Sequence, residues 1–148
     1  MSDLSTKAFA AQDALTAALQ ASPDLAAWHV DYGLPNRRGE LEVWVDEELT
    51  DWHQAPYTTG LESKSERFTL RVFVYARKTG ATALEIRDLL KSAGGRIEAV
   101  IGSAPFLGGA VSLASVSGGE YGGGFADTDG RMREAVLRLD VDCETFLG

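Results

Sequence analysis

Residues 67–77 constrain the fold more than any other segment, because their side chains alternate with the period of a β-strand. One set of alternate residues is apolar throughout: Phe68, Leu70, Val72 and Val74. The other set begins with Thr69 and Arg71 and ends with Phe73 and Tyr75. Successive side chains of a strand point to opposite faces. We therefore expect one face in a core, and the aromatic end of the other covered by a helix or by another subunit.

Shorter patterns predict further elements before this strand. Apolar residues at steps of three and four indicate a helix over residues 4–20, which Pro23 ends. Residues 28–32 and 41–45 alternate, and the Gly- and Pro-containing segment between them has a turn composition. We expect these two strands to form a hairpin.

The C-terminal half gives a helix and two strands. Thr82 and Glu85 have the spacing of a capping box, so a helix starts there. Gly94–Gly95 either breaks this helix or is followed by a second helical stretch. Residues 110–116 and 135–144 are the last two strands, and the order of elements is helix, three strands, helix, two strands.

Two segments without a clear period are expected to be long loops. Residues 47–65 carry Trp52, His53 and Tyr57, which are large side chains for a solvated linker. Loops of this length are uncommon unless they serve a function. Residues 117–133 are rich in glycine, with Tyr121 and Phe125 as the bulky side chains. The large side chains of the first loop either contact a partner or fold back onto the body of the protein. We expect the glycine-rich loop to become ordered when another surface contacts it.

Composition excludes several functions. The chain has 148 residues, one ordinary domain's length, and a net charge of −8, which argues against nucleic acid as the main partner. Cys143 is the single cysteine, so no intrachain disulfide forms. No apolar run reaches the roughly 20 residues of a membrane span, and the N-terminus lacks the basic start of a signal peptide.

No motif indicates catalysis, a metal or a cofactor. The glycine run lacks the Lys-Ser/Thr of a phosphate loop, and Asp127 to Gly130 lacks the spacing of a calcium loop, so an Asx-type turn is expected there. His29 and His53 have no second histidine at ligand spacing. Cys143 shares the inward face of its strand, as a small core residue would. A small enzyme or ligand-binding module that uses His53, or Asp127 with Asp129, stays open as an alternative.

Several segments together resemble the tail-terminator, or tail-completion, proteins of long-tailed phages and gene transfer agents. The likeness spans most of the chain, and it is carried by Asp51-Trp52-His53, residues 66–77, Gly80, the helix of residues 86–90, Leu107-Gly108, the glycine-rich segment and residues 131–139.

This resemblance implies an α+β fold in one domain over residues 1–148, with an antiparallel or mixed sheet and helices on one face. It implies a structural virion protein, made in the host cytoplasm, that forms a hexameric ring at the head–tail junction. The ring would cap the tail tube, end its polymerisation and join it to the head-side connector. DNA would pass through the lumen without specific binding. A head-side neck stopper is the near alternative.

The two loops and the resemblance give the candidate interface residues. They are Trp52, His53, Tyr57, Tyr121, Phe125, Arg131 and Arg133.

Overall fold

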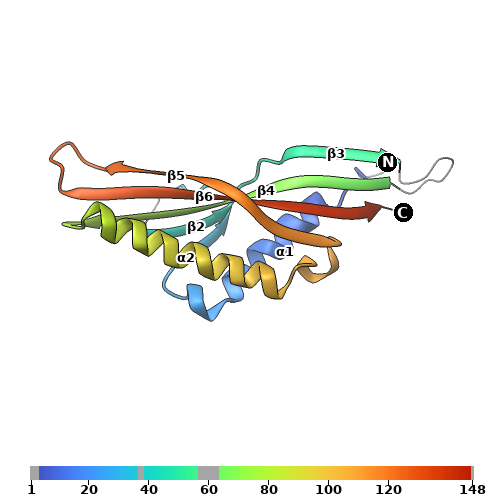
Figure 1. The fold of residues 1–148 in the computed structure, drawn as a ribbon, viewed down its shortest axis with the longest axis horizontal. Coiled ribbons are helices and arrows are strands. Elements are labelled where there is room, and N and C mark those ends of the chain that lie inside the picture. The colour runs from blue at the N-terminus through green and yellow to red at the C-terminus, as the bar shows by residue number, and fades with distance from the viewer. Residues whose placement is uncertain (1–3, 37–38, 57–63, 148) are drawn as a thin grey trace.

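The computed structural model describes residues 4–36, 39–56 and 64–147 (Figure 1). Two helices lie on one face of a six-stranded sheet, which confirms the α+β class. In chain order the elements are α1 (Ala8–Ala21), β1 (His29–Tyr32), β2 (Leu41–Val45), β3 (Thr50–Pro56), β4 (Lys64–Thr79), α2 (Ala83–Ser103), β5 (Leu113–Phe125) and β6 (Met132–Leu147). Two short 3-10 helices, Pro23–Leu25 and Leu107–Gly109, follow α1 and α2.

Strand β4 lies at the centre of the sheet. It pairs along its whole length with β6, while β2 and β3 pair with different parts of its other edge. The predicted apolar face is confirmed, because Phe68, Leu70, Val72 and Val74 are all at most 1% exposed. They pack with the helices in one core, as does Cys143, which also confirms its predicted place.

On the opposite face of the sheet, the aromatic end is not covered by a helix of the described residues, which was one of the two expected covers. Trp44 of β2 stacks on Phe73 of β4, with ring centroids 5.3 Å apart and planes at 12°. Tyr75 donates a hydrogen bond to Glu134 at 2.5 Å and is 3% exposed. Both helices pack on the other face (Figure 1). Neighbouring side chains of the sheet, rather than one of these helices, therefore shield the aromatic end.

Strands β1 and β2 do not form the predicted hairpin. They run parallel, with His29 opposite Glu42 and Tyr32 opposite Val45. Gly33, with φ of 80°, turns the chain out of β1, and its N–H donates to the carbonyl of Val45 at 2.8 Å. The chain between the two strands therefore returns to the starting end of β1 before β2 begins, instead of making a tight turn.

The first predicted loop contains strand β3. It pairs antiparallel with the beginning of β4, and the register shifts between Thr50 and His53. Asp51 has φ of 51°, a left-handed conformation that interrupts the alternation by which a strand is recognised. Tyr57 lies outside the described residues.

The predicted glycine-rich loop is also mostly strand. Gly118 to Phe125 pair with β6 as the second half of β5, so only the segment that follows Phe125 forms the turn. Glycine fits where strands β5 and β6 approach each other closely, because a Cβ on Gly119 would lie 1.9 Å from the carbonyl oxygen of Arg138. The strand forms because β6 supplies its hydrogen-bonding partner, although the glycines give no side-chain pattern.

Helix α2 is continuous through Gly94–Gly95. Its start confirms the predicted cap, since the Glu85 N–H donates to the Thr82 hydroxyl at 3.1 Å. Gly94 faces the sheet, and a Cβ there would lie 3.0 Å from Cδ2 of Leu137. Close packing of the helix on β6 offsets the low helix propensity of this glycine. Over the described residues, neither helix has the length and hydropathy needed to cross a membrane.

The contact at Gly119 predicts a sharp difference between two glycines of β5. We expect Gly119→Ala to lower the free energy of unfolding by about 1–3 kcal/mol, because the Arg138 backbone would have to move. Gly122→Ala is the control, since a Cβ added to Gly122 would have no atom within 4 Å apart from those of its two chain neighbours. It should be neutral or stabilising by up to about 1 kcal/mol. Urea unfolding of both variants measures this, and equal midpoints would contradict the close approach.

Candidate functional site

Those predicted interface residues that the structure describes lie toward opposite ends of β4. Trp52 and His53 are on β3, which pairs with the beginning of β4. Tyr121, Phe125 and Arg133 lie on the β5–β6 hairpin, which flanks the end of β4. Figure 1 shows these two regions at the two ends of the long axis. The structure therefore separates the candidates into two surfaces.

The β3 surface is organised around a buried carboxylate. Glu66 of β4 is fully buried, and its Oε2 accepts hydrogen bonds from Trp52 Nε1 at 2.9 Å and Gln54 Nε2 at 2.7 Å. Thr6 Oγ1 also donates to Oε2 at 2.7 Å, and the Lys7 N–H donates to Oε1 at 2.8 Å. One side chain thus joins β3, β4 and the start of α1.

These hydrogen bonds determine the charge of Glu66. Burial by itself would raise the pKa of the carboxyl, but the bonds from Thr6, Gln54, Lys7 and Trp52 outweigh it and lower the pKa below its usual value. Sequence reasoning missed Glu66, although it left a signal. It has the parity of Phe68 and Leu70, so a charged residue stands on the core face of the strand.

Trp52 and His53 have different environments on this surface. Trp52 is 38% exposed, and its indole N–H donates a hydrogen bond to Glu66 Oε2. His53 is exposed and lies opposite Arg67. It lines a hollow of about 430 Å³ together with Arg67, Thr69, Asp142 and Glu144, among others. His53 is therefore the more accessible of the two for a partner.

The hairpin surface presents aromatic and cationic groups to solvent. Tyr121 and Phe125 are 46% and 50% exposed. The guanidinium carbon of Arg133 lies 4.4 Å from the centre of the Phe125 ring, a cation–π contact. Tyr121 and Arg133 also line a hollow of about 480 Å³ beside the first turn of α2.

The tip of the hairpin is held by the side chain of Asp127, although not in the predicted Asx-type turn, whose hydrogen bond would run to the N–H two residues on. Asp127 Oδ1 accepts hydrogen bonds from the N–H groups of Arg131 at 3.0 Å and Met132 at 3.2 Å. The Gly80 N–H donates to the carbonyl of Arg131 at 2.8 Å, which ties the tip to the segment before α2. Arg131 itself is exposed. These bonds fix the backbone from which Arg131 and Phe125 project.

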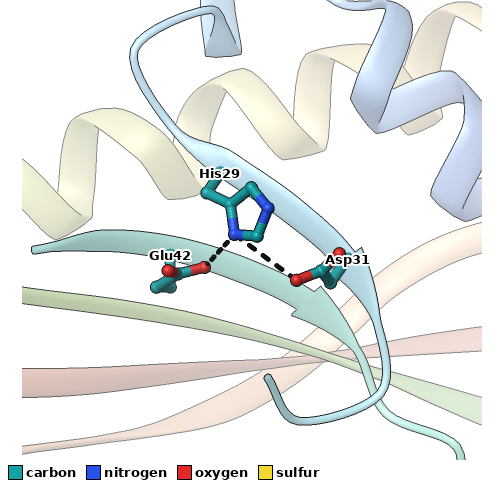
Figure 2. Close-up of side chains that lie close together, drawn as sticks. All are labelled: His29, Asp31 and Glu42. Atoms are coloured by element: carbon teal, nitrogen blue, oxygen red, sulfur yellow. Dashed lines mark hydrogen bonds and ion pairs between the residues drawn. The ribbon is translucent and has the colours of Figure 1, made fainter. Parts of the chain in front are cut away.

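A third cluster of polar side chains lies on β1 and β2 (Figure 2). It contains none of the candidate interface residues. His29 Nδ1 is 2.8 Å from Glu42 Oε2 and 3.4 Å from Asp31 Oδ2. The parallel register of β1 and β2 places His29 opposite Glu42, and Asp31 shares the face of His29 two residues along. Within the described part of the chain, this is the one group of three His, Cys, Asp or Glu residues close enough to hold a metal ion.

The charges of this cluster are coupled. The hydrogen bond to Glu42 raises the pKa of His29, and the negative charges of Glu42 and Asp31 add to the effect. The His29 side chain is 62% exposed, whereas Glu42 is 4% exposed. When it is protonated, the imidazole therefore bridges two carboxylates at the solvent boundary.

Cys143 has no nucleophilic character in this environment. Burial, together with the charge of Asp142, raises the pKa of its thiol to about 12. The thiol is therefore protonated at neutral pH, whereas the thiolate is the reactive form.

The Glu66 network predicts a large effect of an isosteric change. Glu66→Gln keeps the shape but replaces one acceptor with an NH2 group that faces donors. We expect the free energy of unfolding to fall by about 1.5–3 kcal/mol at pH 7. Glu144→Gln, at an exposed carboxylate of β6, should change it by less than about 0.5 kcal/mol.

The difference between these variants should also depend on pH. The folded pKa of Glu66 is lowered, so its contribution is present above the unfolded pKa and is lost as pH falls through the folded pKa. Chemical denaturation at pH 7 and at acid pH checks this. A difference that stays constant into acid would contradict the charged network.

A second prediction concerns His29. In buffer containing a chelator, NMR titration should give His29 a pKa above the usual value of about 6.5, and Glu42→Gln should lower it. Because the folded pKa is raised, His29 stabilises the fold below the unfolded pKa and loses this effect as pH rises through the folded pKa. An unchanged titration in Glu42→Gln would show that the 2.8 Å contact does not form.

The chain is similar to known proteins in structure rather than in sequence. No protein-family model matches the chain, and a search of curated proteins finds no match. Among solved structures, the chain is similar to a chain described as "Virion of native gene transfer agent (GTA) particle". The sequence identity is 15% and the TM-score 0.46, with 90% of this chain and 93% of that chain covered.

Proposed function

We propose that the protein is a structural component of a phage-like tail, a tail terminator that works by assembly and without a catalytic step. In this proposal six copies form a ring that caps the tail tube and meets the head-side connector. The sequence resemblance suggests this role. The hairpin surface is the observation that carries it, since it offers a contact site in a chain without a catalytic motif.

The composition of the hairpin surface is typical of a protein interface. Aromatic residues and arginine are enriched at such interfaces. Tyr121, Phe125 and Arg131 are exposed together, and all described residues from 117 to 131 are solvent-accessible. The hydrogen bonds that Asp127 accepts fix the tip, so little backbone entropy is lost when a partner binds.

The second surface gives each copy two different contact sites. The β3 end, with Trp52 and His53, lies opposite the hairpin across the length of the sheet (Figure 1). A contact between two different surfaces is heterologous, and it closes into a ring when the rotation between copies allows. In our proposal the hairpin surface of one copy contacts the β3 surface of the next copy, and the ring closed in this way meets the tail tube.

The charge of the chain suits a passage for DNA. Each copy has a net charge of −8. The face of β6 opposite the helices carries Asp140, Asp142 and Glu144, of which Asp140 is paired with Arg138 at 3.0 Å and Glu144 with Arg67 at 3.9 Å. An acidic lumen repels the phosphate backbone, so DNA would slide through without being held.

The proposal predicts that the purified protein forms six-membered rings or caps tail tubes. Light scattering gives the mass, and negative-stain images show rings and tube ends, with and without tubes of the tail-tube protein from the same particle. We expect the double variant Tyr121→Ser, Phe125→Ser to keep its fold and lose at least one of these activities, because both side chains are exposed.

Phe106→Ser is the matched control. Phe106 is 57% exposed but lies just after α2, away from the hairpin, so its loss should leave assembly unchanged. Normal capping by the hairpin variant would contradict the role of that surface. A protein that stays monomeric and does not bind tail tubes would contradict the tail-terminator function. Binding to the head-side connector alone would favour the neck-stopper function.

A further inference from the structure

We propose that His29, Asp31 and Glu42 bind one divalent transition-metal ion of the zinc class. This inference does not depend on the proposed function, and it departs from the expectation of no metal. That expectation followed from the lack of a second histidine near His29 in the sequence. The structure instead supplies two carboxylates, one of them from the neighbouring strand (Figure 2).

The distances between the three groups suit a shared ion. One ligand atom from each residue lies within 4.8 Å of the other two. Ligands at about 2.0–2.2 Å from a tetrahedral zinc are about 3.4 Å apart. His29 Nδ1 is 3.4 Å from Asp31 Oδ2 and 2.8 Å from Glu42 Oε2, while the spread of the three ligand atoms reaches 4.8 Å. Binding an ion therefore requires the exposed imidazole to move away from Glu42 and the Asp31 carboxylate to turn toward the ion.

Glu42 is the positioned ligand of the cluster. Its side chain is 4% exposed, and its Oε1 accepts a hydrogen bond from the Gly39 N–H at 2.8 Å. This bond leaves Oε2 directed at His29. A Cβ on Gly39 would lie 3.1 Å from Oε1, so the glycine lets the backbone approach the carboxylate. Outer contacts of this kind orient metal ligands in proteins.

The ligand chemistry determines the class of ion. One imidazole and two carboxylates suit zinc and related first-row ions, and a three-residue set leaves a further position for water. The ion would take the place of the proton on Nδ1 of His29, between the imidazole and the two carboxylates. Two negative carboxylates and one neutral imidazole would then surround the doubly charged cation. It would also link β1, the edge strand of the sheet path, to β2.

The test uses the full chain after treatment with a chelator and its removal by dialysis. Titration with Zn²⁺ should raise the thermal unfolding midpoint and saturate at one ion per chain. Co²⁺ should give the visible absorption of a bound ion of low coordination number. We expect His29→Ala to weaken Zn²⁺ binding by more than about tenfold, the lower limit seen even for outer contacts of metal sites.

Matched variants separate this site from adventitious binding. Asp31→Asn should also weaken binding, while His53→Ala and Asp88→Asn change the same residue types elsewhere and should have no effect. His53 and Asp88 are both exposed. Because His29 is exposed too, His29→Ala should fold normally, which circular dichroism checks.

The outcomes decide the proposal. Loss of binding in His29→Ala and Asp31→Asn, but in neither control, supports it. Absence of Zn²⁺ and Co²⁺ binding, or binding that His29→Ala leaves unchanged, overturns it. Ring formation and tube capping are measured separately, so either proposal can fail without the other.

Discussion

Sixteen consecutive residues of β4 pair with sixteen of β6, and the other elements are arranged around this ladder. The pair gives the core a continuous apolar row, on which α1 and α2 pack. Its two outer edges are extended by β2 and β3 on one side and by β5 on the other. The length of the ladder also separates the two candidate interaction surfaces.

The sequence predicted the elements whose side chains show a clear period. The alternation around Leu70 and around Leu139 indicated β4 and β6, and the steps of three and four indicated α1. It missed β3, because Asp51 and a register shift break the alternation. It missed half of β5, because glycine has no side chain to alternate. The parallel direction of β1 was missed since alternation is the same in either direction.

Candidate residues were predicted less completely than strands. Exposed aromatic residues such as Tyr121 and Phe125 could be selected because a solvated loop rarely keeps them. Glu42 and Glu66 could not be selected from residue type alone, since carboxylates are usually solvated. Glu66 could have been found from its inward parity. Glu42 required the pairing of β1 with β2, which depends on the path of the chain between them.

The register of the central ladder also has a kinetic meaning. It joins Lys64 to Leu147 and Thr79 to Met132, with α2 and β5 lying between the two strands in sequence. Pairs this distant close slowly, because the entropy of the intervening chain must be lost first. During synthesis, β4 therefore exists with a bare edge and an apolar face until β6 has left the ribosome. That interval is when the chain is most exposed to aggregation and most in need of a chaperone.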